Sequence, residues 1–410
     1  MGSIFKLAWR NIWRNTRRTI LTMCAIGFGA SLIVFSVGLQ LGQYDLMISG
    51  STKIYQGLVQ VQKEGYLDDA RMRDSIPNAQ ALGDEIRKLS GIKDITVRAN
   101  GFALVSSEER TYGVAVAGVE PEHEDGVSII PGLIKTGKYL SDNDAQEIVI
   151  GASLAKNLKI TVGDELTIMG SGRDGSIAAT ILPVVGIFES GSRELDRSLV
   201  QIPIDTFQDA FSMEEHAHAI VIYHKDANLA EPLKLQLQTL VSKRQQQLVA
   251  LTWDEIQPGI KESIELDYSS GWVMYIVLVA VITFSIMNTF LMSVLERTRE
   301  FGIMLALGFK PFNIGKLVMM EAFILTLLAL VIGTLIGIAV NYYFLINGLT
   351  FEGMEEIAAQ YNMPATITPQ ISLESSLLGP LVILIFTLLA ALYPAMKIRK
   401  LEPVEAMRHI

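Results

Sequence analysis

Two short patterns in this 410-residue sequence contain residue types that could bind a phosphate or a metal ion. Residues 132–138 read GLIKTGK and match the GxxxxGK pattern, in which backbone amides surround phosphate oxygens. Such a loop also needs Ser or Thr as its next residue, to hold magnesium, and a helix directly after it. Here Tyr139 comes next, and a Ser-Asp-Asn-Asp run follows it. We interpret the match as coincidental and expect no ATP hydrolysis by this chain.

The histidines suggest a second kind of chemistry. His216 and His218 alternate along a predicted strand, so both side chains would face one side and could ligate a metal ion. No third histidine or cysteine lies near them, and we favour the alternative, the edge of a surface strand without metal. No Ser-His-Asp arrangement or pair of catalytic carboxylates stands out. We therefore expect no catalytic residue, no metal site and no bound cofactor in this chain.

A charged segment, residues 296–308, reads ERTREFGIMLALG and lies between two long apolar runs. Between two membrane spans such a segment must face water. Gly308 suits the end of a helix. A connecting loop needs no apolar side chains, so we expect a short helix that docks on a partner through an exposed stripe of Phe301, Met304 and Leu305; the alternative is a solvated loop. The residues assigned to docking are Glu296, Arg297, Arg299, Glu300, Phe301, Gly302, Met304, Leu305 and Gly308.

Four apolar runs determine the class of protein. They cover residues 19–42, 271–295, 317–346 and 377–396. A bilayer core requires roughly 20 apolar residues of helix, so each run can span a membrane, the longest with some tilt. The sequence predicts an α-helical membrane part with four transmembrane helices and a large extramembrane domain, residues 43–270, between the first two.

Lysine and arginine residues near the spans predict the orientation. Residues 1–18 contain five basic residues and no acid, whereas residues 347–376 contain four acids and no lysine or arginine. Basic residues also occur in the 296–316 segment and in the tail, 397–410. We therefore expect both termini and the 296–316 segment in the cytoplasm. Residues 43–270 and the 347–376 loop are expected on the outer side.

The outer domain is predicted to be α+β, with a β-rich part at about 100–205 between more helical flanks. Residues 43–268 contain 21 basic and 34 acidic residues, a net charge of −13, which argues against nucleic acid as a partner. Because Cys24 is the only cysteine, this domain has no disulfide. Helices are predicted at 77–90, 152–158 and 228–248, and strands at 58–62, 94–99, 102–106, 111–119, 147–150, 165–169, 178–188, 198–202 and 217–223.

Residues in and beside the spans indicate how helices are placed. The N-terminal residues 1–18 form a predicted amphipathic helix on the inner membrane surface. Gly333 and Gly337 allow close helix approach, by default within one chain and alternatively in a dimer. Asn288 is expected to hydrogen-bond between helices. Glu321 is expected at the inner membrane interface, with a gating role as the alternative.

Three motifs of the chain carry a resemblance to a known family. They are AWRNIWRNTRRTIL from residue 8, NTFLMSVLERTREFGIMLALG from residue 288 and YPAMKIRKLEPVEAMR from residue 393. Together they resemble the FtsX-like, or MacB-type, permeases of ABC transporters (type VII). The order of one span, a large domain and three further spans is similar over nearly the whole chain. Within that family, residues 57–66, GLVQVQKEGY, are most similar to the lipoprotein-release permeases of the LolC and LolE type.

The resemblance implies a mechanism. Two permease chains, identical or homologous, would associate with a cytoplasmic dimer of separate ATPase subunits that hold ATP and magnesium. The 296–308 segment would be the coupling helix that fits the ATPase. The spans would pass its movement to the periplasmic domain, which is called mechanotransmission. The outer domain would combine a ferredoxin-like part with an inserted β-rich part, and the chain would lie in the bacterial inner membrane.

The resemblance also suggests a substrate. Lipoprotein release from the inner membrane to a periplasmic carrier is the favoured function. The alternatives are efflux of peptides, toxins or drugs with a periplasmic adaptor, and signalling to a cell-wall hydrolase. Apolar residues at the outer mouth of the first span could contact acyl chains, or could pack within the domain; they are Leu39, Leu41, Leu46, Met47 and Ile48.

Overall fold

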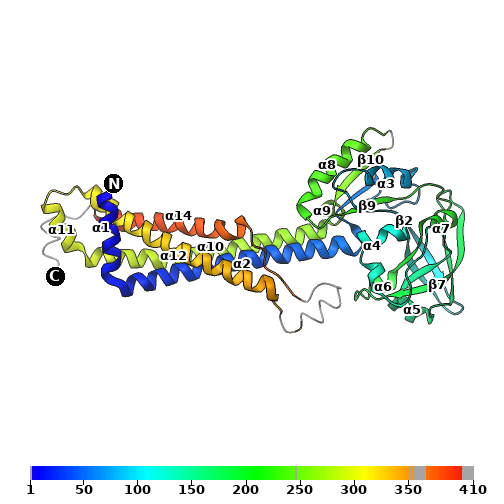
Figure 1. Ribbon diagram of the computed structural model, residues 1–410, viewed down its shortest axis with the longest axis horizontal. Helices are drawn as coiled ribbons and strands as arrows, with labels where there is room; N and C mark the ends of the chain where they lie inside the picture. Colours follow the sequence, from blue (N-terminus) through cyan, green and yellow to red (C-terminus); the bar gives the residue numbers. More distant parts are fainter. Residues whose placement is uncertain (1, 245–246, 351–352, 354–365, 399–410) are drawn as a thin grey trace. The chain divides into compact units, whose positions relative to one another are not determined.

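The computed structural model describes most of the chain, namely residues 2–244, 247–350, 353 and 366–398 (Figure 1). Parts of the predicted 347–376 loop and nearly all of the predicted 397–410 tail lie outside these described residues. The chain separates into two compact units. A helical unit contains residues up to Tyr44, Ile264–Leu349 and residues from Thr366 onward, and a sheet unit consists mainly of Asp45–Ser263.

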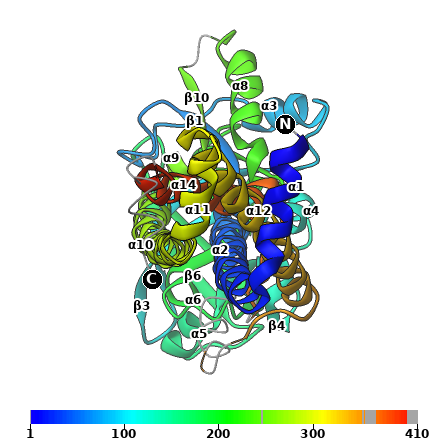
Figure 2. The same cartoon turned by 90° about the vertical axis from the view of Figure 1, so that its left-hand side faces the viewer.

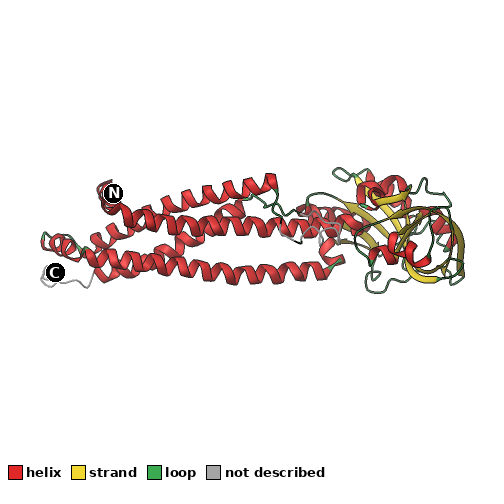
Figure 3. Ribbon diagram, turned by 90° about the horizontal axis from the view of Figure 1, so that it is seen from below, coloured by secondary structure: helices red, strands yellow, loops and turns green. Residues whose placement is uncertain are grey.

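The helical unit contains the four long helices that the apolar runs predict. Among the described residues, α2, α10, α12 and α14 are long and apolar enough to cross a membrane, and each contains one predicted span (Figure 3). The short helix α1 packs against α12 (Figure 2). The bounds are α1 Gly2–Ile12, α2 Thr16–Ser51, α10 Pro258–Glu296, α11 Thr298–Ala306, α12 Pro311–Asn347 and α14 Leu373–Lys397.

Local sequence sets the ends of these helices. Pro311 lies in the first turn of α12, where a missing backbone N–H costs nothing. Gly348 ends α12 with a φ of +70°, a conformation that glycine adopts readily. Ser372 precedes α14, and its hydroxyl accepts a hydrogen bond from the backbone N–H of Ser375 at 3.1 Å.

Helices α2 and α12 contact each other backbone to backbone at two glycines. A Cβ atom on Gly333 would lie 2.3 Å from the carbonyl oxygen of Gly27, so the two backbones are in direct contact. Further along α12, the side-chain amide of Asn341 donates a hydrogen bond to the carbonyl of Val34 at 3.0 Å. These contacts join the first and third predicted spans within one chain.

Four strands of the sheet unit form a ferredoxin-like sheet. Their order is β10-β1-β9-β2, and all neighbours are antiparallel. Helix α3 (Ala79–Arg87) connects β1 to β2, and α8 (Ala230–Val241) connects β9 to β10, which gives the β-α-β-β-α-β pattern. The strands are β1 Val59–Lys63, β2 Asp94–Ser106, β9 Ala219–Tyr223 and β10 Leu248–Thr252.

The segment inserted between β2 and β9 closes into a barrel. Strand β2 pairs with β3, and the pairing continues through β8, β5, β7 and β6 back to β2. Closure leaves these strands without free edges, which protects them from pairing with other chains. The strands are β3 Thr111–Val119, β4 Ile134–Gly137, β5 Ile148–Gly151, β6 Glu165–Ser171, β7 Ile177–Phe188 and β8 Leu199–Pro203; β4 pairs with β7 outside the ring. Short helices lie between them, namely α4 Pro121–Val127, α5 Ala152–Leu158, α6 Leu195–Ser198 and α7 Ile204–Ala210, and α9 (Trp253–Ile256) follows β10.

The predicted fold class is therefore confirmed, but several predicted elements are corrected. The predicted strands 94–99 and 102–106 are one strand, because Gly101 provides space beside Phe207 and does not form a turn. The predicted helix 228–248 is shorter, and Leu248 begins β10. Leu248 pairs with β1, whose edge lies open there, and this long-range effect is not contained in local propensity.

Candidate functional site

The 296–308 segment forms a separate short helix, α11. It begins after Arg297, whose backbone (φ −100°, ψ 9°) leaves the helical region and separates α11 from α10. It ends at Gly308, with a φ of +90° that favours glycine. Pro311 then starts α12. The non-helical backbone at Arg297, the glycine at 308 and the proline at 311 together turn the chain between the long helices α10 and α12.

The predicted exposed stripe on α11 is wrong. Phe301 is fully buried and Gly302 is buried. Met304 and Leu305 pack against the same buried cluster, which contains Val294, Phe301, Ile314, Val318, Ala395 and Ile398. This face of α11 packs on α10, α12 and α14, so the face is covered within the chain instead of being exposed to a partner.

The opposite face of α11 is exposed. It carries Arg299, Ile303 and Leu307, spaced about one turn apart, and the side chain of Leu307 is 74% exposed. Phe309, just beyond the helix, is also exposed. Several large apolar side chains beside an arginine form a surface that suits a protein partner. We call Arg299, Ile303, Leu307 and Phe309 the outer face of α11.

Charged side chains connect α11 to the N-terminal segment. Arg14 forms an ion pair with Glu300 at 2.7 Å, and Arg18 forms one with Glu296 at 2.7 Å. Both pairs are partly exposed. Burial raises the pKa of Glu300, but hydrogen bonds from Arg14 and Arg297 outweigh it and hold that pKa below its usual range. Glu296 and Glu300 are thus each paired with an arginine from the N-terminal segment.

Glu321 has unexpected partners. It is buried and forms an ion pair with Arg297, whose Nη1 lies 2.8 Å from Oε2. The side-chain amide of Asn11 donates a second hydrogen bond to Glu321 at 2.7 Å. Two donors from other parts of the chain thus replace water around this carboxylate, and the expected position of Glu321 at the inner membrane interface stays a prediction. Neither Asn11 nor this pairing was anticipated, since the partners are far apart in the sequence.

The residues predicted to pack helices divide into two groups. Gly333 contacts Gly27, and a Cβ on Gly337 would lie 2.8 Å from Val34, so both glycines lie against α2. Asn288 is exposed, and within the described part of the chain no hydrogen bond joins it to another helix. Asn341 makes the interhelical hydrogen bond instead.

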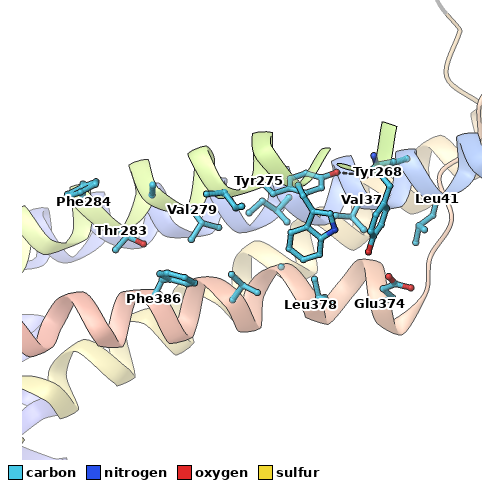
Figure 4. Close-up of a pocket in the computed structure, with 17 residues that line it drawn as sticks. Val37, Leu41, Tyr268, Tyr275, Val279, Thr283, Phe284, Glu374, Leu378 and Phe386 are labelled. Atoms are coloured by element: carbon cyan, nitrogen blue, oxygen red, sulfur yellow. Dashed lines mark hydrogen bonds between the residues drawn. The ribbon is translucent and has the colours of Figure 1, made fainter. Parts of the chain in front are cut away.

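An apolar cavity of 330 Å³ lies in the helical unit between α2, α10 and α14 (Figure 4). Aromatic side chains of Tyr268, Trp272 and Tyr275 line one wall, and Gln40 and Glu374 supply polar groups at the same end. Leu41, a predicted acyl-chain contact, lines this cavity. Leu39 is half-buried on the same helix, and Leu46, Met47 and Ile48 are half-buried in the part of α2 that belongs to the sheet unit.

The other candidate chemistries occupy ordinary structural positions. Residues 132–138 form a turn of 3-10 helix and strand β4, which differs from the strand–loop–helix of a phosphate-binding loop. His218 is fully buried, accepts a hydrogen bond from the Asn100 N–H at 2.9 Å and stacks on Tyr66, so its assignment to a surface strand edge is wrong. His216 contacts Arg173. No cluster of three or more His, Cys, Asp or Glu suited to a metal ion occurs among the described residues.

Comparison with known proteins gives a consistent result. Residues 19–240 match the model of the MacB-like periplasmic core domain, and residues 272–403 match that of the FtsX-like permease C-terminal domain. The chain is 24% identical over 421 residues to the lipoprotein-releasing system transmembrane protein LolE of Haemophilus influenzae, covering 99% of each. It is 24% identical over 322 residues to the lipoprotein-releasing system transmembrane protein LolC of Neisseria meningitidis serogroup B, covering 75% of this chain and 76% of the relative.

The chain is also similar to a macrolide export protein and to a solved periplasmic structure. The macrolide export ATP-binding/permease protein MacB of Campylobacter jejuni is 22% identical over 414 residues, covering 98% of this chain and 61% of the relative. The crystal structure of the periplasmic region of MacB from Actinobacillus actinomycetemcomitans is similar with a TM-score of 0.37 and 18% identity, covering 51% of this chain and 94% of that one. The MacB-like core model alone matches more than half of the chain, and the FtsX-like model covers most of the segment from α10 to α14. This multi-pass inner-membrane protein therefore belongs to the FtsX-like permeases with a MacB-like periplasmic core domain, which are ABC transporter permeases of the MacB and LolC/LolE type.

Proposed function

We propose that this chain is the non-catalytic transmembrane subunit of an ABC transporter and that it transmits the movement of a separate ATPase to the sheet unit. A cytoplasmic ATPase dimer would supply the ATP and magnesium sites. A second permease chain, identical or homologous, would complete the complex. In this arrangement both termini and α11 lie in the cytoplasm, and the sheet unit lies in the periplasm.

The geometry of α11 carries this proposal. One face of the helix is anchored in the buried cluster around Phe301, and the outer face presents Arg299, Ile303 and Leu307 to solvent. A helix fixed on one side and apolar on the other is suited to receive force from a partner and to pass it to the helices beneath. Among the residues assigned to docking from the sequence, Phe301, Gly302, Met304 and Leu305 would therefore support α11, and Arg299 would contact the partner.

Co-purification tests the coupling role. Ile303→Asp places a charge on the outer face without entering the buried cluster, and should strongly reduce the ATPase that co-purifies with the full-length chain. Leu67→Asp is a matched control, because Leu67 is another exposed apolar residue, 44% exposed, on the sheet unit. ATPase recovery at the wild-type level with Ile303→Asp would remove α11 from the ATPase contact.

For the substrate, we propose lipoprotein release from the inner membrane. The cavity between α2, α10 and α14 supports this, because its wall is almost entirely apolar and Glu374 lies beside Tyr268 at one end. Such a site suits an acyl chain whose polar end lies beside Gln40 and Glu374. The relatives named for lipoprotein release also cover this chain over most of its length. Efflux of a peptide or drug remains the second candidate, since a macrolide export protein is among the relatives.

Filling the cavity tests the substrate proposal. Ala280 lines the cavity, so Ala280→Trp should occupy the space and reduce the lipoprotein that co-purifies with the complex. Val281→Trp is the matched control, because the neighbouring Val281 is 64% exposed and lies outside the cavity lining. Mass spectrometry of the purified complex identifies the bound molecule, and a peptide or drug in place of a lipoprotein would support the second candidate.

A further inference from the structure

Five side chains around the start of α11 are linked by hydrogen bonds into a chain whose two ends, Asn11 and Arg14, belong to the same N-terminal segment; we call this set the ring. Arg297 donates to both oxygens of Glu321, at 2.8 and 3.1 Å, and its Nε donates to Glu300 at 3.2 Å. Arg14 donates to Glu300 at 3.0 Å, and Asn11 donates to Glu321 at 2.7 Å. Asn11 lies in the last turn of α1, and Arg14 lies three residues further on in the 3-10 turn that follows it, so the ring returns to its starting segment.

The two sides of this ring differ in burial. The side chains of Arg297 and Glu321 are 10% and 9% exposed, whereas those of Arg14 and Glu300 are 53% and 46% exposed. Exposed ion pairs contribute little and are screened by salt. A buried charge that loses its partner is strongly unfavourable. The Arg297–Glu321 pair is therefore the part of the ring that constrains α11.

Arg297 is also the residue at which the chain bends. Its backbone is the only non-helical position between α10 and α11, and its carbonyl accepts a hydrogen bond from the N–H of Phe301 at 3.0 Å. Its guanidinium lies 5.0 Å from the centre of the Phe301 ring. The side chain that holds Glu321 thus belongs to the residue whose backbone sets the direction of α11.

Glu321 lies on the face of α12 that supports α11. Ile314, Val318 and Glu321 are spaced by four and three residues, and the first two belong to the buried cluster around Phe301. A polar cavity of 240 Å³ borders the pair, lined by residues that include Arg18, Ser293 and Glu296. The surroundings are polar and not tightly filled, so the pair can rearrange without displacing apolar packing.

We propose that Glu321 is a positioning residue that, through Arg297, fixes the direction of α11 and makes α11, α12 and the N-terminal helix move as one piece. The proposal rests on the coupling function of α11. In this view ATPase docking depends on the outer face, and transmission of the movement depends on Glu321. A variant without the Glu321 charge therefore binds the ATPase but does not couple to it.

The test uses the full-length chain with its co-purified ATPase in lipid nanodiscs. Glu321→Gln keeps the shape and removes the charge. We expect near wild-type co-purification and an about tenfold loss of the permease-dependent stimulation of ATP hydrolysis. The exchanged pair Arg297→Glu with Glu321→Arg should recover a measurable part of the stimulation that Glu321→Arg alone loses, which a general loss of stability would not allow.

Two further variants keep the proposal testable. They are used if Glu321→Gln does not yield folded protein. Arg297→Lys keeps a charge beside Glu321 but removes the Nε hydrogen bond to Glu300, and Asn11→Leu removes the other donor to Glu321. Both variants should lower the stimulation of ATP hydrolysis while the ATPase stays bound. Normal stimulation in Glu321→Gln, or no recovery in the exchanged pair, overturns the positioning role. Ile303→Asp separates the two ideas: if it fails to reduce ATPase binding, the coupling function itself is wrong.

Discussion

At the scale of single residues, several ionised side chains have a specific partner of opposite charge. In the helical unit, the arginines of the N-terminal segment pair with Glu296 and Glu300 beside α11. In the sheet unit, Arg98 and Glu124 form a fully buried ion pair at 2.5 Å, and Arg98 also donates to the carbonyl of Tyr55. Removing one member of the buried Arg98–Glu124 pair would leave a buried charge without its partner, which is strongly destabilising.

Charge reversal at Glu300 is expected to disturb α11 without altering its buried cluster. Glu300→Lys places a cation beside both Arg14 and Arg297, so the helix start loses two hydrogen bonds and gains repulsion. We expect less ATPase to co-purify with this variant at low salt, with partial recovery at high salt, where the repulsion is screened. Adding Arg14→Glu should restore one pair, and an unchanged ATPase yield in Glu300→Lys would contradict the role assigned to this residue.

His218 is expected to make the sheet unit sensitive to acid. Burial lowers the pKa of His218 from 6.5 to about 4, and its Nδ1 accepts the Asn100 N–H, so the folded protein holds it neutral. Above pH 6.5 the ring is neutral in both states. As the pH falls towards 4 the unfolded chain binds a proton that the folded chain does not, so the free energy of unfolding falls by about 3 kcal/mol.

Urea unfolding of the sheet unit at several pH values measures this effect. His218→Asn should reduce the dependence of the unfolding free energy on pH between 6.5 and 4, even though it lowers stability at every pH. Equal slopes for wild type and His218→Asn would assign the acid sensitivity to other groups.

At the scale of elements, close backbone contact joins two of the membrane helices. Gly27 and Gly333 permit α2 and α12 to touch, and Asn341 adds a hydrogen bond between the same two helices. Water cannot drive helices together inside a bilayer, so packing and hydrogen bonds must do so. Helices α2 and α12 are far apart in the sequence, so only folding brings them into contact.

A large side chain at Gly333 is expected to separate these helices. In Gly333→Leu the Cβ atom would lie 2.3 Å from the carbonyl of Gly27, so the backbones must move apart at a cost of about 2 kcal/mol or more. Gly315→Leu on the same helix is the control, because its Cβ would lie an ordinary 3.5 Å from the nearest atom. Thermal unfolding in detergent should show a lower transition temperature for Gly333→Leu only.

At the scale of the whole molecule, charge and hydropathy divide the chain into parts with different surroundings. The residues 43–268 carry a net charge of −13, while basic residues gather beside the spans and in residues 1–18. This distribution predicts that the sheet unit faces the periplasm and that α11 faces the cytoplasm.

Cysteine labelling tests this orientation. In a Cys24→Ser background, Asp174→Cys in the sheet unit should react with a membrane-impermeant maleimide on intact spheroplasts. Lys310→Cys, beside α11, should react only after permeabilisation. Both positions are exposed, so access to the reagent depends on the side of the membrane. The opposite pattern would reverse the topology and exclude contact between α11 and a cytoplasmic ATPase.

The sequence by itself determined the membrane helices, the short helix at 296–308 and the α+β class of the outer domain. These features follow from local composition, because a bilayer selects each apolar segment separately and because glycine, proline and capping residues act on their own neighbours. The motifs that carry the family resemblance are also continuous stretches of sequence, so they can be found without the tertiary structure.

Tertiary structure alone decided which side chains are buried. A membrane helix is apolar on all sides, so no periodicity distinguished Asn341, which binds another helix, from Asn288, which is exposed. In α11 the apolar residues occupy both faces, and only the packing of α12 and α14 showed that Phe301 is inside. Glu321 accepts a hydrogen bond from Asn11, 310 residues away, because a buried carboxylate is tolerated only where folding brings donors to it.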